Sequence, residues 1–73
     1  MTLLNAEVGR EYIINEINVK GDEELVSFLF SLGCYSGESI TVVTRRKKTC
    51  VISVKDSRYS IDNQLADAIT LKD

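Results

Sequence analysis

The chain contains no histidine among its 73 residues, so the commonest metal ligand and the commonest general base are both missing. A conventional nucleophile and base pair cannot be assembled without it, and no glycine-rich segment resembles a phosphate-binding loop. The sequence therefore predicts a protein that is not an enzyme and that has no catalytic residue, no cofactor and no metal site.

Long apolar runs and a secretory signal are also missing. The longest apolar runs, such as residues 12–14, are far shorter than the roughly 20 residues that span a bilayer. Residues 1–7 show no basic segment followed by an apolar stretch. We therefore expect no membrane insertion and a cytoplasmic location. In that reducing compartment the two cysteines, Cys34 and Cys50, should be free thiols that behave as small apolar residues.

The chain has no strong charge of one sign. Nine basic and eleven acidic residues give a formal charge of −2, which creates no overall attraction to nucleic acid or anionic lipid. A chain of 73 residues should form one domain, residues 1–73, because it supplies apolar material for a single core and little to line a deep cleft. Binding to a partner protein is then the favoured kind of function, and no nucleic acid is expected as a partner.

Alternating apolar and polar residues predict five short strands. The first three fall at residues 10–17, 39–44 and 50–55. A short fourth strand ends at Tyr59 and Ile61, and the last covers residues 69–71. Ile17 is out of step with Ile14, which predicts a bulge near Asn15 and Glu16. Turns are expected at Gly37 and at Asp56-Ser57. The pattern indicates a mostly β fold in which a strongly bent sheet closes as a small barrel.

One helix is predicted at residues 22–32. Its apolar stripe has the i, i+3, i+4, i+7 spacing and consists of Leu25, Phe28, Leu29 and Leu32. Asp22 is suited to cap the first turn, and Gly33 to end the helix in the left-handed conformation. The acidic run that starts at Asp22 could bind a cation, but capping explains its position directly. A second helical turn, capped by Asp62 or Asn63, should run through Leu65 and Ala66.

A set of glycine and aliphatic positions has a characteristic order and spacing over nearly the whole chain. These positions are Leu3, Gly9, Ile14, Ile17, Leu25, Leu29, Leu32, Gly33, Gly37, Ile40, Val42, Ile52, Val54, Ala66 and Ile69. The most specific element among them is Leu32-Gly33-x-x-x-Gly37. In this order and spacing the chain resembles the FeoA family of small ferrous iron transport proteins.

The resemblance implies an SH3-like β-barrel, similar to the C-terminal domain of iron-dependent repressors. It also implies a cytosolic accessory protein of bacterial ferrous iron uptake that acts with the membrane transporter FeoB and its GTP-hydrolysing domain. The chain departs from the family pattern at Phe28, Cys34, Ser36 and Cys50. Imidazole and carboxylate ligands, which suit ferrous iron, are not gathered anywhere in the sequence.

Two features are candidates for partner binding. Val26 and Phe30 form an i, i+4 apolar pair beside the predicted core stripe of the helix. Either the helix packs against the core over a broader face than this stripe, or the two residues present a docking patch. Arg45, Arg46, Lys47 and Lys48 gather at a predicted hairpin tip. This run is either a solvated loop or a contact with an acidic surface, a phosphate or lipid headgroups.

Two other kinds of function stay open on the sequence. Small barrels with basic loops and exposed aromatic residues bind nucleic acids, although no aromatic residue interrupts the basic run here. A stand-alone regulatory domain like that of iron-dependent repressors could act only on a separate protein, because the chain carries no helix-turn-helix. Exposed edge strands would also allow self-association.

Overall fold

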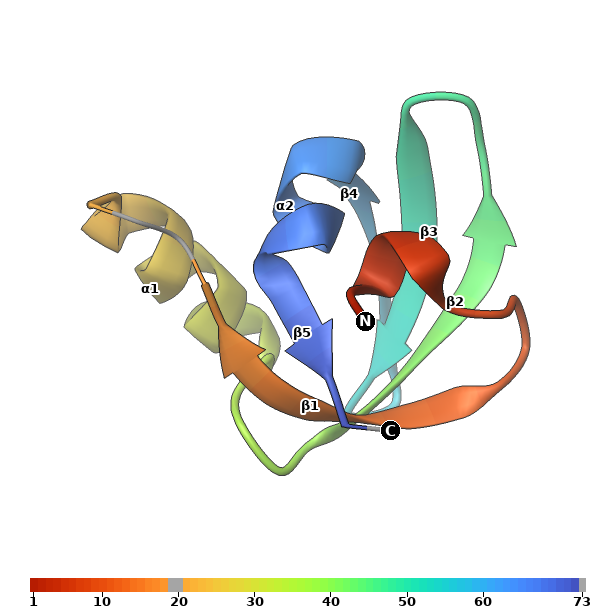
Figure 1. Ribbon diagram of the computed structural model, residues 1–73, viewed down its shortest axis with the longest axis horizontal. Helices are drawn as coiled ribbons and strands as arrows, with labels where there is room; N and C mark the ends of the chain where they lie inside the picture. The colour runs from red at the N-terminus through yellow and green to blue at the C-terminus, as the bar shows by residue number, and fades with distance from the viewer. Residues whose placement is uncertain (19–20, 73) are drawn as a thin grey trace.

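The computed structural model describes residues 1–18 and 21–72, in which five antiparallel strands form one sheet in the order β4-β3-β2-β1-β5 (Figure 1). The elements are, in chain order, the 3₁₀ helix η1 (Leu3–Asn5), β1 (Glu11–Ile17), α1 (Glu23–Leu32), β2 (Ser39–Arg45), β3 (Thr49–Val54), β4 (Ser57–Asp62), α2 (Asn63–Ala68) and β5 (Ile69–Leu71). The predicted mostly β architecture is confirmed. The sequence did not predict η1.

Strand β1 bends the sheet because its two halves pair with different strands. Glu11 to Ile13 pair with β2, whereas Ile14 to Ile17 pair with β5. The register with β5 shifts between Ile14 and Glu16, which confirms the predicted bulge. Figure 1 shows the resulting long, curved strand running under both parts of the sheet.

The core lies inside this bent sheet and draws on both helices, η1 and all five strands. Alternate residues of β2 and β3 are buried, as period-2 strands with one face on a core require. The side chains with at most 2% exposure are Leu3, Ile14, Leu29, Cys34, Ile40, Val42, Cys50, Ile52, Val54, Ile61, Ala66 and Ile69.

Helix α1 has the predicted ends. The Asp22 carboxylate accepts a hydrogen bond from the Leu25 N–H at 3.2 Å, which confirms its capping role. Gly33 ends the helix with φ of 97° and donates its N–H to the carbonyls of Leu29 and Phe30. One member of the predicted stripe is wrong: Phe28 is 46% exposed. Only a narrow face of α1 meets the barrel. Successive residues of an α-helix are rotated by about 100° around its axis, so Phe28 lies outside that face.

The β3–β4 hairpin turns one residue earlier than predicted. Its two central residues are Lys55 and Asp56, with φ of 49° and 64°, so the turn is of the I′ type. The sequence signal was weak because this turn lacks the Asn-Gly or Asp-Gly pair that usually marks it. The second helix, α2, is capped by Asp62 as expected and covers Asn63–Ala68, longer than the single turn predicted.

Replacement of Gly33 by alanine should destabilise the fold. A Cβ there would meet the flexible Lys55 side chain, with Cδ at 2.9 Å, and would also be held at a positive φ. We expect the free energy of unfolding to fall by about 1–2 kcal/mol. Urea denaturation measures it, with Ser27→Ala on the exposed surface of α1 as the control. Equal stability of the two variants would contradict the argument.

Candidate partner-binding surfaces

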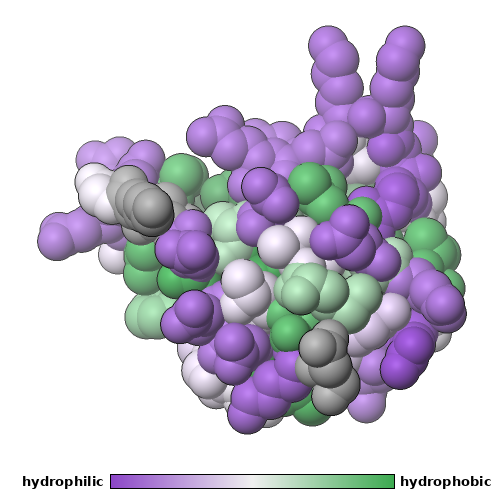
Figure 2. All heavy atoms as spheres, in the orientation of Figure 1, coloured by the Kyte–Doolittle hydropathy of each residue, from purple (hydrophilic) through white to green (hydrophobic). Residues whose placement is uncertain are grey.

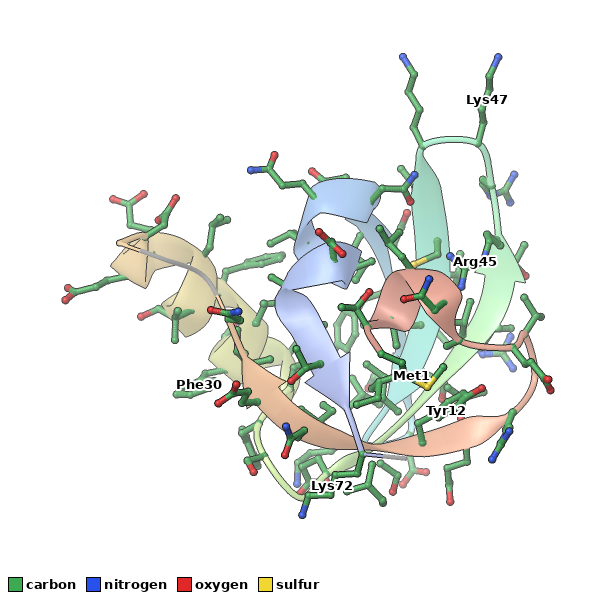
Figure 3. All side chains as sticks on the ribbon, in the orientation of Figure 1. Met1, Tyr12, Phe30, Arg45, Lys47 and Lys72 are labelled. Carbon is green, nitrogen blue, oxygen red and sulfur yellow. The ribbon has the colours of Figure 1, made fainter. Side chains whose placement is uncertain are left out.

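The hairpin between β2 and β3 ends in three exposed cations, Arg46, Lys47 and Lys48, which we call the basic tip. Lys47 extends away from the barrel (Figure 3). The backbone of the tip is held in place: Arg46 N–H donates to the Thr49 carbonyl at 2.8 Å. Asn63 donates its backbone N–H to the Lys48 carbonyl at 3.0 Å and its side-chain amide to the Lys47 carbonyl at 3.3 Å. The loop thus displays three exposed cationic side chains on a backbone that is held by hydrogen bonds.

Arg45, predicted as part of the same run, lies in β2 and is half-buried. Its guanidinium group donates to the carbonyls of Leu3 and Ala6, each at 3.0 Å. These bonds hold η1 and the following residue against β2. Arg45 therefore stabilises the fold, and the exposed charge of the hairpin comes from the three residues after it.

The flank of α1 carries a second surface, formed by Val26, Phe30 and Tyr35, which we call the aromatic patch. Val26 is half-buried, whereas Phe30 is 50% exposed and Tyr35 is 38% exposed. The two rings meet edge to face, with centroids 6.0 Å apart and planes at 84°. The predicted pair is thus joined by a third apolar residue.

Tyr35 is a residue that the sequence analysis missed. The left-handed Gly33 reverses the chain at the end of α1 and returns residue 35 beside the last turn of the helix. Lys55 lies over the Tyr35 ring, with Nζ 5.1 Å from its centroid, and pairs with Glu38 at 3.1 Å. The pKa of Lys55 is raised, first by its hydrogen bond to Glu38 and next by one to Tyr35. A charge-neutralised pair therefore borders the patch.

The two surfaces lie on opposite sides of the molecule. Figure 3 shows Phe30 on α1 at one side and Lys47 at the far tip of the hairpin. In Figure 2 the hairpin ends in hydrophilic side chains, whereas apolar side chains reach the surface around α1. A partner that touches both surfaces must extend across much of a molecule whose extents are 30 × 25 × 23 Å.

Both cysteines are buried free thiols, as predicted. Burial raises the pKa of Cys34 to about 11. It also raises the pKa of Cys50, although the positive charge of Arg45 acts in the opposite direction. Within residues 1–18 and 21–72, no group of three or more cysteine, aspartate and glutamate side chains is arranged to hold a metal ion.

A shallow groove of about 340 Å³ separates α1 from α2, a feature that the sequence did not predict. Its lining combines apolar side chains with amides and carboxylates and contains no nucleophile. The lining residues are Asn18, Asp22, Leu25, Gln64, Leu65, Asp67 and Ala68. In the described part of the chain, no helix combines the length and apolar character needed to cross a bilayer.

The model of the FeoA domain matches residues 1–73 of the chain. A FeoA protein of Stenotrophomonas maltophilia, solved with zinc and described as a prokaryotic SH3 domain protein, superimposes with a TM-score of 0.88. The identity is 16%, over 99% of this chain and 89% of that one. A FeoA described as an iron uptake regulatory protein gives a TM-score of 0.84 and 23% identity, over 99% and 93% of the two chains.

A manganese-dependent transcriptional repressor also superimposes, with a TM-score of 0.83 and 17% identity over 94% of this chain and 39% of the repressor. The comparison with curated proteins found no match. At these identities the solved structures show the fold, and they confirm the SH3-like barrel expected from the sequence.

Replacement of Arg45 should cost stability, whereas replacement of Arg46 should not. One guanidinium nitrogen, Nη2, donates to both carbonyls, and the lysine nitrogen of Arg45→Lys is one bond closer to the backbone. The variant keeps the charge but loses this reach, so we expect a loss of about 1–3 kcal/mol. The exposed Arg46→Lys should stay within about 0.5 kcal/mol of the original protein. Chemical denaturation of both variants measures the difference. Equal losses would show that the Arg45 contacts do not hold the N-terminal segment.

The thiols should react only after unfolding. Because burial raises the pKa of Cys34 to about 11, its thiolate is scarce at pH 8 and also shielded. We expect a disulfide reagent at pH 8 to label neither cysteine in the folded chain and both in urea. Rapid labelling without urea would contradict the burial.

The same thiol makes stability depend on pH. In the unfolded chain Cys34 ionises near pH 9, below its folded value of about 11, so the free energy of unfolding should fall as pH rises between about 9 and 11.

Proposed function

The chain belongs to the FeoA family, which is linked to ferrous iron transport, and we propose that it is a cytoplasmic, non-catalytic accessory protein that binds the cytoplasmic part of the FeoB transporter. The observation that carries this proposal is the aromatic patch on α1. A helix flank with a half-exposed phenylalanine beside a tyrosine exceeds what the core of this chain requires.

Phe30 is the anchor of the proposed contact. Its ring is held by Tyr35 on one side and leaves half of its surface for a partner. Aromatic side chains dominate the energy of protein interfaces because they bury a large area at little conformational cost. Lys55 and Glu38 lie next to Tyr35 and supply the polar rim that such a contact needs.

The basic tip supports the proposal in a different way. Its three cations stand on a backbone fixed by Asn63, on the side of the molecule away from Phe30. Exposed charges of this kind accelerate encounter with an acidic or anionic surface more than they strengthen the final complex. In this proposal the aromatic patch supplies most of the binding free energy, and the basic tip accelerates association.

The nucleic-acid alternative receives no support from the arrangement of these groups. Single-stranded nucleic acids are held by aromatic rings that lie along a basic groove. Here the exposed rings belong to α1 and the turn after it: they are Phe28, Phe30 and Tyr35. The basic tip lies at the far hairpin. The formal charge of −2 adds no general attraction.

The test compares two phenylalanines of the same helix. Phe30→Asp should weaken binding of the purified FeoB cytoplasmic domain by about 30-fold or more, the scale of a lost aromatic anchor. Phe28→Asp makes the same change at a similarly exposed position on the opposite flank of α1 and should leave binding within about threefold. Calorimetry in the apo, GDP and GTP-analogue states measures both.

The role of the tip is tested by salt. Substitution of Lys47 and Lys48 by glutamine should slow association and flatten its dependence on ionic strength, with little change in the dissociation rate. Failure of the original chain to bind in every nucleotide state would overturn the proposal. Equal effects of the Phe28 and Phe30 variants would move the contact away from the aromatic patch.

A further inference from the structure

The two ends of the sheet differ in how their outer edges are covered. At β5, Thr2 forms a bridge to Thr70, and the Leu71 N–H donates to the Met1 carbonyl at 2.9 Å. At the other end, β4 pairs with β3 alone, and no backbone bond outside that pairing reaches Arg58 or Ser60 from any described residue. The edge of β4 is therefore open.

The turn geometry shows which backbone groups point outward from β4. A type I′ turn is closed by a hydrogen-bonded pair, here Val54 and Ser57. Hydrogen-bonded and non-bonded pairs then alternate along an antiparallel ladder. The N–H and C=O groups of Arg58 and Ser60 and the N–H of Asp62 consequently face away from β3, whereas the Asp62 carbonyl serves the first turn of α2. The side chains of these three residues are exposed on the outer face of the sheet.

This edge has none of the bulges, prolines or lysines that often prevent pairing with another strand. The ladder between β3 and β4 runs from Thr49 opposite Asp62 to Val54 opposite Ser57 without a bulge, unlike the ladders at β1 and β2. The strand contains no proline and no lysine, and its one cation and one anion cancel. A regular edge with no net charge leaves its unpaired N–H and C=O groups available to another strand.

The charges on β4 are arranged to match a second copy of the same strand. In an antiparallel pair with its two-fold axis at Ser60, each Arg58 lies opposite Asp62 of the other copy, and the two Ser60 residues face each other. Arg58 forms no ion pair with a described residue. Only one Asp62 oxygen, Oδ1, is used to cap α2. A shift of the axis to Tyr59 would put Arg58 opposite Ser60 and lose both charge pairs.

We propose that the chain forms a symmetric dimer by antiparallel pairing of β4 with β4 of a second copy, with the two-fold axis at Ser60. The Ser60–Ser60 pair exchanges two backbone hydrogen bonds, each Asp62 N–H donates to the Arg58 carbonyl of the other copy, and opposite charges flank the centre. The sheets of the two molecules then join into one continuous sheet. The dimer is independent of the transporter contact, since the aromatic patch belongs to α1 and the turn after it.

The first test is sedimentation equilibrium of the purified chain from micromolar to millimolar concentration, where the mass should rise from monomer to dimer. Arg58→Asp places like charges opposite each other at both ends of the pairing and should raise the dissociation constant by about tenfold or more. Lys72→Asp makes the same change of charge beyond β5 and should not alter it.

Backbone pairing is tested by Ser60→Pro. The Ser60 N–H has no partner in the single chain, so the fold should survive, whereas the central donor of the dimer is lost. Circular dichroism verifies folding. The register is tested by Ser60→Cys, because directly opposed residues have Cα atoms about 5.5 Å apart, within disulfide range. Mild oxidation should crosslink this variant rapidly and Thr44→Cys, on the exposed face of β2, slowly.

Three results would contradict the proposal. A chain that stays monomeric up to millimolar concentration does not use this edge for itself, and the edge is then free for a strand of another protein. A dimer that tolerates both Arg58→Asp and Ser60→Pro is assembled elsewhere. Equal crosslinking of Ser60→Cys and Thr44→Cys would reject the two-fold axis at Ser60.

Discussion

The double pairing of β1 is the constraint on which the rest of the structure depends. Its first half belongs to the sheet with β2, and its second half belongs with β5, so the chain between Ile14 and Glu16 must change register. This bend lets a chain of 73 residues surround one core with one sheet. Figure 1 shows α1 beside the outer end of β1, and the inner face of the helix adds the fully buried Leu29 to the core.

Because the core is small, large apolar side chains of α1 remain on the surface. Only a narrow face of α1 can be buried, which leaves Phe28 and Phe30 half-exposed on opposite flanks of the helix. Phe30 has an aromatic neighbour, because Gly33 turns Tyr35 back toward it. A left-handed glycine that ends the helix thus also builds the aromatic patch.

The run of four basic residues shows where local sequence stops being informative. The pattern placed a hairpin there, and the hairpin is present between β2 and β3. Arg45 nevertheless differs from its neighbours, since its guanidinium group reaches the carbonyls of Leu3 and Ala6 some forty positions earlier in the chain. No local pattern records such a contact. The bulge near Asn15, by contrast, could be predicted because it follows from a break in a period-2 alternation.

The sequence by itself determined the strands, the α1 caps, the bulge and the buried thiols, because alternation, capping and helix termination act over a few neighbouring residues. It also carried the family resemblance. Tertiary structure decided which exposed side chains meet and which edges stay open. Tyr35 meets Phe30 through the reversal at Gly33, and the N-terminal segment covers the edge of β5 while the edge of β4 stays open. Both depend on how distant segments share one small core, which spacing along the chain does not encode.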